Sequence, residues 1–290
     1  MAEDIHKFRH DAMNTWFEMS IRTDNKSLAR NAATEAFREI DRLENLLSRF
    51  REGSDVDILN KKASREPVRV TEECWKCILQ AMDLEILTDG VFSIAFEAFM
   101  LADNVENKPV IGAWLEMDPT NATVFFKYPD LRIDLGGIGK GYALDLVAQL
   151  MEDWDVTDFL LHSGTSSVIA RGNQEGSDGW IVSVGADISG QDLTLRNESL
   201  SASSLAVQSA HILNLKSQAV LETDRRTWAW APSGAISDAL STTFMLVDST
   251  RIEDLCSRHE GLGALVVDPE IKTPLVYGVA KDRLTDTNSG

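Results

Sequence analysis

The segment that most constrains how this chain folds is residues 133–147, IDLGGIGKGYALDLV. Its pattern predicts a strand ending in Asp134, a glycine-rich turn that contains Lys140, and then a helix. Such a turn lets the backbone approach a ligand closely and aims the N–H groups of the helix at an anion. It is neither a Walker A loop, G-x-x-x-x-G-K-[ST], nor the G-x-G-x-x-G of a dinucleotide-binding fold. Taken alone, the turn fits a structural role as well as an anion site.

A second segment, residues 236–246 (ISDALSTTFML), places Asp238 and Thr242 four residues apart. If the segment is helical, both side chains lie on one face. A carboxylate and a hydroxyl so placed suit a hard, oxygen-seeking cation such as Mg²⁺. The alternative is an aspartate that caps the helix N-terminus and a threonine buried for packing.

The apolar pattern predicts a mixture of strands and helices. Residues 12–23 alternate apolar and polar side chains like a strand, and residues 27–50 carry apolar side chains at helical spacing. Further helices are predicted at 72–88 and 141–153, and short strands at 122–126, 131–135, 158–162, 167–171, 179–184, 211–215 and 243–248. Strands and helices come in clumps rather than in strict alternation. We therefore expect an α+β fold with mixed, largely antiparallel sheets packed with helices, rather than a doubly wound parallel sheet.

The domain organisation follows from what the sequence lacks. No internal repeat and no low-complexity linker interrupts it. We therefore expect one compact unit over residues 1–290, with short flexible termini at about 1–8 and 281–290.

The charge balance excludes some classes of partner. The formal net charge is −18 at pH 7, which argues against nucleic acid, because binding to a phosphate backbone draws on clustered Lys and Arg. The same charge disfavours an anionic membrane surface, and no apolar run approaches the length of a membrane span. A phosphate-rich ligand would need a metal ion, a lysine or backbone N–H groups to offset this charge locally.

The N-terminus and the cysteines indicate the compartment. Residues 1–16 carry acids at Glu3 and Asp4 and lack the apolar core of a signal peptide, and the three cysteines fit a reducing environment, so we expect a cytoplasmic protein. Cys74 and Cys77 form a C-x-x-C, but neighbouring apolar residues recur at helical spacing and no second ligand pair accompanies them. We expect these two thiols to be buried on a helix.

Taken together, the two segments resemble a known family. D-L-G-G-I-x-K-G-Y-A-x-D, followed about a hundred residues later by D-A-L-S-T, is similar to the signature of the ApbE-type FAD:protein FMN transferases. Smaller matches follow in the order of the family: Ala12 to Thr15 resembles A-M-G-T, Ser48 to Phe50 resembles S-x-Y, and Ser54 to Asn60 resembles S-x-x-x-x-x-N. This resemblance covers nearly the whole chain and implies an ApbE-like, T-fold-like architecture.

Three further matches are looser. Residues 88–93 (TDGVFS) resemble T-x-G-A-F-D, residues 163–165 (SGT) lie where G-G-D or G-G-N is usual, and residues 211–215 (HILNL) lie where H-I-I-D-P is expected. In these matches Ser93 replaces an aspartate and Asn214 replaces another, while Phe50 lacks the hydroxyl of the family tyrosine. A weakened flavin pocket is one reading of these departures.

The resemblance implies a role for each matching residue. It implies that the side chains of Asp238 and Thr242 and a backbone oxygen of Gly137 hold Mg²⁺, and that Asp238 is essential to catalysis. His211 resembles the family histidine proposed to assist the reaction; the alternative is a strand histidine packed for structure. The residues expected near FAD are Met13, Phe50, Val91, Phe92, Ser93, Asp134, Lys140 and Thr165.

The implied reaction is attack by a Thr or Ser hydroxyl of an acceptor flavoprotein on the FMN phosphorus of FAD, with release of AMP. The expected acceptor carries a D-x-x-[ST]-G-A-[ST]-like motif, and this chain contains no good copy of it. Two alternatives remain open. One is an FAD-binding or assembly protein that has lost the chemistry, and the other is an FAD pyrophosphatase that gives FMN and AMP.

Overall fold

The structure is a computed structural model, and it describes residues 4–95, 112–129, 131–183, 192–204, 213–214, 219–220, 223–271 and 273–285. The chain divides into two compact units. The first unit comprises Met1–Ile40, Lys140–His211 and Glu222–Gly290, and the second comprises Asp41–Gly139 and Ile212–Leu221. Each unit is described by itself.

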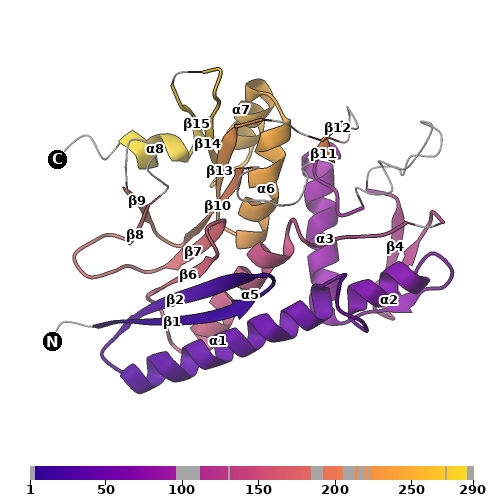
Figure 1. Cartoon of the computed structure of the whole chain (residues 1–290), viewed down its shortest axis with the longest axis horizontal. Coiled ribbons are helices and arrows are strands. Elements are labelled where there is room, and N and C mark those ends of the chain that lie inside the picture. Colours follow the sequence, from indigo (N-terminus) through magenta and orange to yellow (C-terminus); the bar gives the residue numbers. More distant parts are fainter. Residues whose placement is uncertain are drawn as a thin grey trace. The chain divides into compact units, whose positions relative to one another are not determined.

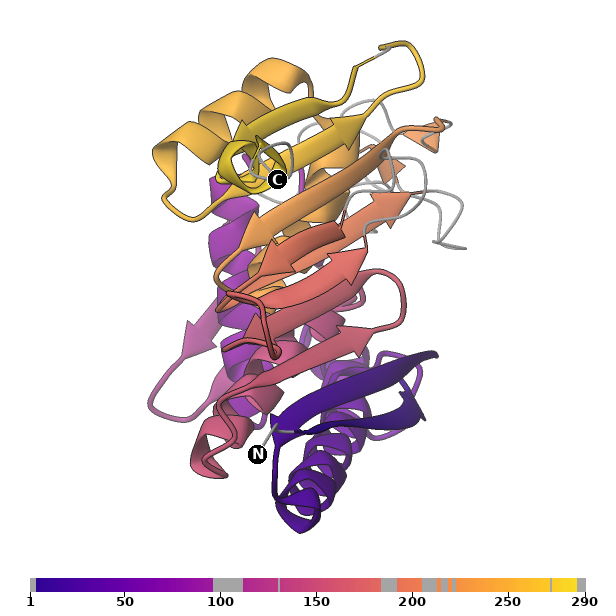
Figure 2. The same cartoon turned by 90° about the vertical axis from the view of Figure 1, so that its left-hand side faces the viewer.

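The first unit contains an eight-stranded sheet in which every pair of neighbouring strands is antiparallel. Figure 2 shows these strands side by side, from β1 in indigo to β15 in yellow. In order across the sheet they are β1 (Asp4–Ala12), β2 (Thr15–Thr23), β6 (Phe159–Ser163), β7 (Ser167–Arg171), β10 (Glu198–Ser204), β13 (Arg226–Ala231), β14 (Gly263–Val267) and β15 (Leu275–Gly278). The α+β prediction with antiparallel sheets is confirmed.

Alternating side chains of this sheet enter two separate cores. The first core joins residues such as Leu161 and Ile169 to α1 (Lys26–Leu47, as far as Ile40) and α5 (Gly139–Asp153). The second joins Leu160 and Val168 to the β8–β9 hairpin (Trp180–Ser183, Asp192–Leu195) and α8 (Ala280–Thr285). Because successive residues of a strand point to opposite faces, these cores lie on opposite sides of the sheet.

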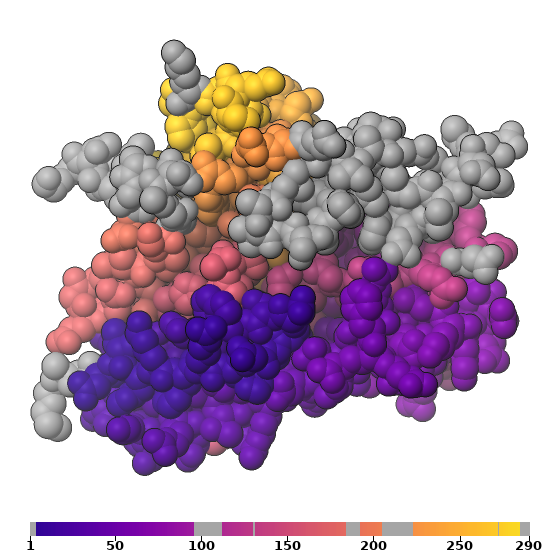
Figure 3. Space-filling view, in the orientation of Figure 1, coloured from indigo at the N-terminus to yellow at the C-terminus, as the bar shows by residue number. Residues whose placement is uncertain are grey.

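Two more helices complete the first unit. α6 (Gly234–Leu246) packs against β10 and β13, and α7 (Ser249–Arg258) packs against β14 and β15 (Figure 1). At the other end of the sheet, β1 is an edge strand whose outward side chains are exposed, which the indigo surface in Figure 3 shows.

The second unit contains the end of α1, then α2 (Asp55–Lys62) and α3 (Glu72–Leu87), with a three-stranded antiparallel sheet. The strand order is β3 (Val68–Arg69), β5 (Thr123–Phe126) and β4 (Leu115–Asp118), and β11 (Leu213–Asn214) pairs with β12 (Ala219–Val220). Cys74 and Cys77 are both fully buried in α3, so the prediction of buried helix thiols is confirmed.

Two predicted strands do not form. The strand at 243–248 is wrong, because α6 starts at a capped N-terminus and continues through Leu246, burying Phe244 and Met245 as a helix. The strand at 131–135 is also absent. There the side-chain amide of Asn60 takes the place of a neighbouring strand: its Nδ2 donates to the Ile133 carbonyl at 2.9 Å, and its Oδ1 accepts from the Ile133 N–H at 2.8 Å.

The N-terminal region differs from its prediction as well. Residues 4–8, expected within a flexible terminus, belong to β1, and the predicted strand at 12–23 is the second half of a β1–β2 hairpin. The predicted helices at 27–50, 72–88 and 141–153 form within three residues of their expected bounds. Among the described residues, no helix has the length and apolarity that a membrane span requires.

Candidate functional site

Asp238 lies at the centre of a polar cluster in the first unit. Its side chain is 8% exposed; Oδ1 accepts a hydrogen bond from Ser167 Oγ at 3.2 Å and Oδ2 accepts one from the Gly141 N–H at 3.1 Å. The ammonium of Lys140 lies 3.7 Å from Oδ2. Ser233, not Asp238, is the N-cap of α6, so the capping alternative for Asp238 is wrong. The carboxylate instead binds the start of α5.

Thr242 lies one turn after Asp238 on α6, as the spacing predicts. Its hydroxyl is 3.1 Å from the hydroxyl of Ser203 on β10. Further hydroxyl–hydroxyl hydrogen bonds join α6 to β10. Ser237 pairs with both Ser199 and Ser201, and Ser241 pairs with Ser203. Because these side chains are small, α6 lies close to the sheet. This packing holds Asp238 and Thr242 in place, one helical turn apart.

Asp145, on α5, makes the reciprocal contact. Its carboxylate accepts hydrogen bonds from Ser233 Oγ at 2.7 Å, from the Gly234 N–H at 2.6 Å and from the Ala235 N–H at 2.9 Å. Burial raises the pKa of this carboxyl, and these donors oppose that shift. The sequence patterns alone do not indicate a role for Asp145. The available signal was its place as the last aspartate of the D-L-G-G-I motif.

The starts of α5 and α6 meet without side chains between them. A Cβ at Gly141 would lie 2.1 Å from the carbonyl oxygen of Gly234, and a Cβ at Gly234 would lie 2.5 Å from that of Gly141. Only glycine permits such an approach at both positions. Each helix therefore presents its N-terminal N–H groups to a carboxylate on the other.

Met13 and Thr165 lie in two turns that contact each other in the first unit. Met13 and Asn14 form the β1–β2 turn with positive φ values of 49° and 57°, and asparagine adopts this conformation more readily than most residues, which explains why it can stand where the family has glycine. The Gly164 N–H donates to the Trp16 carbonyl at 2.7 Å. Thr165, next in the turn, is exposed.

Phe50 and Asp134 are brought together in the second unit by an arginine. Phe50 is 82% exposed, which is unusual for a large apolar side chain. The guanidinium of Arg49 lies 4.8 Å from its ring centroid, and Arg49 Nε is 3.2 Å from Asp134 Oδ2. Asp134 Oδ1 also accepts the Gly136 N–H of the glycine turn at 2.8 Å. The sequence pattern alone does not indicate that Arg49 links Phe50 to Asp134.

Val91, Phe92 and Ser93 follow the C-terminus of α3 in the second unit. Thr88 accepts the Phe92 N–H at 3.1 Å, and Ser93 Oγ donates to a buried glutamate, Glu85, at 3.1 Å. A Cβ at Gly137 would lie 3.4 Å from the Phe92 ring. The structure therefore places Phe92 beside the glycine turn.

Two predicted features lie outside the described residues or only partly within them. His211 is outside them, so its role stays a prediction. Asn214 belongs to β11, of which only the strand pairing is described.

The oxygen donors present fit a magnesium ion. Within the described residues, no three His, Cys, Asp or Glu side chains cluster as metal ligands. Mg²⁺ does not require such a cluster, because it commonly binds one or two carboxylates, retains several waters and takes substrate phosphate oxygens. Asp238 accepts two hydrogen bonds, which leaves lone pairs on a carboxylate that offers about four.

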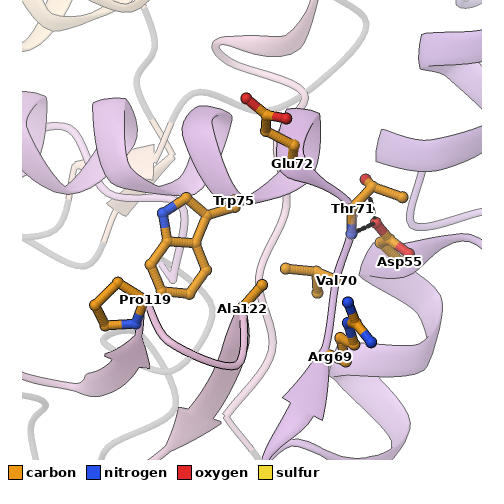
Figure 4. Close-up of a pocket in the computed structure, with 8 residues that line it drawn as sticks. All are labelled: Asp55, Arg69, Val70, Thr71, Glu72, Trp75, Pro119 and Ala122. Carbon is orange, nitrogen blue, oxygen red and sulfur yellow. Dashed lines mark hydrogen bonds between the residues drawn. The ribbon is translucent and has the colours of Figure 1, made fainter.

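A surface pocket of about 670 Å³ in the second unit contains none of the predicted residues. Figure 4 shows the Trp75 indole beside Pro119 and Ala122, with Thr71 hydrogen-bonded to Asp55. Since Asp55 accepts both the N–H and the hydroxyl of Thr71, its carboxylate stabilises the start of α3.

Comparison with known families decides what the chain is related to. A model of the ApbE family matches residues 13–266. The chain belongs to the ApbE family. A relative from Klebsiella pneumoniae named FAD:protein FMN transferase is 27% identical over 147 residues, and the alignment spans 46% of each protein, so about half the length of that relative.

Longer matches support the same family. An FAD:protein FMN transferase from Escherichia coli is 22% identical over 303 residues, covering 93% of this chain and 86% of that protein. The solved structure of the flavin transferase ApbE from Vibrio cholerae has a TM-score of 0.82 at 15% identity and covers 97% of this chain and 99% of that one. At this identity, the match shows that the chain has the ApbE fold.

Proposed function

We propose that this ApbE-family chain is a Mg-dependent FAD:protein FMN transferase. The observation that carries the proposal is Asp238, a carboxylate held by Ser167 and by the start of α5, with Thr242 one turn further along the same helix. The names of its relatives support the reaction class. The whole chain would form one ApbE-like domain and act in the cytoplasm.

The proposed metal ligands are the side chains of Asp238 and Thr242 and a backbone oxygen of Gly137. Glycine suits the third position, because the ligand there is the main chain. When bound, Mg²⁺ would neutralise charge on the pyrophosphate and on the departing phosphate. Lys140 would add a compact positive charge beside the same phosphates. These local charges would offset the net charge of −18.

The proposed FAD contacts are those that the family resemblance implies. The exposed ring of Phe50 offers a stacking surface for the flavin, and Arg49 fixes its position relative to Asp134. Val91 and Phe92 would contact the flavin, with Ser93 contributing through its main chain. Met13 and Thr165 would contact FAD from their turns in the first unit.

The proposed step is a transfer of FMN to a hydroxyl. The hydroxyl oxygen of the acceptor Thr or Ser forms a bond to the FMN phosphorus, while the bond from that phosphorus to the bridging oxygen breaks. AMP leaves with the bridging oxygen and its electron pair. His211 is the proposed acceptor of the hydroxyl proton.

The transfer test uses the purified chain, FAD, Mg²⁺ and a domain that carries a D-x-x-[ST]-G-A-[ST] motif. We expect the acceptor to gain the mass of FMN, and Asp238→Ala to reduce the rate at least about a hundredfold. Asp153→Ala, an exposed carboxylate on α5, is the matched control and should retain the wild-type rate. Wild-type activity in Asp238→Ala would refute the assignment.

One observation favours a second candidate, an FAD-binding protein without transfer. Ser93 replaces the family aspartate, and its hydroxyl donates to Glu85 instead of offering a carboxylate to a ligand. This candidate predicts that FAD binds while the acceptor mass stays constant and no AMP appears. AMP and FMN formed without acceptor modification would instead identify a pyrophosphatase.

A further inference from the structure

Glu85 is a fully buried carboxylate near the end of α3, in the second unit. Among the described residues, every hydrogen-bond partner of its carboxylate is a donor. Oε2 accepts from Ser93 Oγ at 3.1 Å, the Trp114 indole N–H lies 2.8 Å from Oε2 and 3.1 Å from Oε1, and Oε1 accepts from the Gly112 N–H at 3.2 Å. These bonds satisfy a carboxylate in its ionised form, which accepts and does not donate.

The main chain of Glu85 contacts the same turn from its other end. The Glu85 carbonyl accepts the Gly90 N–H at 2.8 Å, and the carboxylate binds Ser93. Between these two contacts lie Val91 and Phe92, the residues assigned to the flavin. One residue therefore holds both ends of this short segment.

Within the part of the chain that the structure describes, the Ser93 hydroxyl makes two hydrogen bonds to the protein itself, one of them to Glu85. Ser93 is 8% exposed, its hydroxyl donates to Glu85, and the same oxygen accepts the Ala95 N–H at 3.1 Å. Its hydroxyl proton is therefore already used within the protein. Ser93 is suited to shaping the turn through Glu85, rather than to contacting a ligand through its side chain.

We propose that Glu85 is a positioning residue for FAD, which holds the Val91–Phe92 segment in its binding shape through Ser93, Gly112 and Trp114. This inference rests on the proposed function. It also explains why serine is required at position 93 of this chain: an aspartate there would place a second buried carboxylate against Glu85, and like charges at that distance cannot both be ionised without a large cost.

The test is a pair of substitutions read by FAD affinity, without acceptor or Mg²⁺. Ser93→Asp should raise the Kd for FAD about tenfold or more, because it introduces the repulsive pair. Adding Glu85→Gln to that variant should return the Kd to within about threefold of wild type, since the new amide can donate to the new carboxylate. Asp83→Asn, an exposed position on the same helix, is the control and should bind FAD as wild type does.

Glu85→Gln alone gives a second, independent measurement. It leaves one acceptor oxygen for three donors, so the KM for FAD should rise about three- to tenfold while kcat at saturating FAD changes less than about twofold. Amide hydrogen exchange of residues 88–95 in the ligand-free protein should become faster in this variant.

The outcomes separate the inference from the proposed function. Wild-type FAD affinity in Ser93→Asp, failure of the double variant to recover, or unchanged exchange and KM in Glu85→Gln would each overturn the role of Glu85. If Ser93→Asp does not fold, the KM for FAD and the hydrogen exchange of Glu85→Gln decide whether Glu85 has this role. If the wild-type chain binds FAD but never modifies an acceptor, the transferase proposal falls, while the affinity and exchange measurements still test Glu85.

Discussion

Asp145 and Asp238 are both aspartates that bind the N-terminus of a neighbouring helix. Their hydrogen-bond partners leave them with different abilities to bind a cation. Asp145 accepts three strong hydrogen bonds from the start of α6. Asp238 accepts one backbone and one hydroxyl donor, with the Lys140 ammonium further away at 3.7 Å. Asp238 therefore retains capacity for a cation, whereas Asp145 serves the helix that carries Asp238.

We predict that Asp145→Ala lowers the free energy of unfolding by about 2 kcal/mol, because it leaves the Gly234 and Ala235 N–H groups without their acceptor. Chemical denaturation of the variant and of Asp153→Ala, which is exposed on the same helix, measures this effect. The control should change stability by less than about 0.5 kcal/mol. Equal stability of the two variants would show that the hydrogen bonds of Asp145 contribute nothing to stability.

Phe50→Ala should separate binding from stability. The ring is 82% exposed, so its removal should leave the melting temperature nearly unchanged. Loss of a stacking surface for the flavin should weaken FAD binding about tenfold, which equals roughly 1.4 kcal/mol. Titration of FAD fluorescence gives the affinity, with Leu79→Ala, another exposed apolar side chain, as the control. Unaltered affinity in Phe50→Ala would remove Phe50 from the flavin site.

Glu85 should make stability depend on pH in a defined direction. Burial raises its pKa in the folded protein above the ordinary value of 4.5. The pH-dependent part of its contribution to stability is therefore fully present below that value and is lost as the pH rises through the folded-state pKa. The unfolding free energy of wild type minus that of Glu85→Gln should fall from about pH 4 upward. Urea denaturation across the pH range checks this, and a difference that grows with pH would contradict it.

The contact between α5 and α6 is a property of two elements. Their N-termini cross at Gly141 and Gly234, and each helix carries the carboxylate that binds the start of the other. A shift of either helix would therefore move Asp238 relative to Lys140 and Ser167. The geometry of the site depends on this crossing.

Two alanine substitutions test the crossing. At Gly141 a Cβ would lie 2.1 Å from a backbone oxygen, whereas at Gly139 it would meet nothing within 4 Å. Gly141→Ala should cost about 1–3 kcal/mol of stability or more, while Gly139→Ala should be nearly neutral. Thermal unfolding compares the two. Similar melting temperatures would show that α5 and α6 can separate without cost.

Sequence patterns predicted the helices and strands in which apolar side chains recur at regular spacing because one face of the element is buried. The helices at 72–88 and 141–153 and the strand at 167–171 fall into this group. The strand predicted at 131–135 failed because its partner is a side chain, Asn60, seventy-three residues away. The strand predicted at 243–248 failed because a cap at Ser233 and tertiary packing extend a helix through β-prone residues.

Residues of the candidate site could be predicted only where they belong to a family motif. The family resemblance supplied Asp238, Thr242 and Gly137, and the helical spacing of the first two is confirmed. Asp145, Arg49 and Glu85 were missed, since each acts through a partner far along the chain or through burial, and neither leaves a pattern in the sequence. The contacts that indicate these roles are visible only in the structure.

For the whole molecule, net charge and chain order set what the proposed binding of FAD requires. The net charge of −18 repels an anionic ligand at long range, so the binding energy must come from local groups such as Lys140 and the start of α5. The assigned residues are spread from Met13 to Thr242. The proposal therefore requires most of the chain to be folded before FAD binds.

The ratio of FMN bound to the acceptor to AMP released, measured in one reaction, tests the transferase proposal most directly. Mass spectrometry of the acceptor and chromatography of the nucleotides give both quantities. The proposal predicts one AMP for each FMN transferred, and formation of both products at least about a hundredfold slower with Asp238→Ala. AMP in excess over modified acceptor, or modification at the wild-type rate in Asp238→Ala, would contradict it.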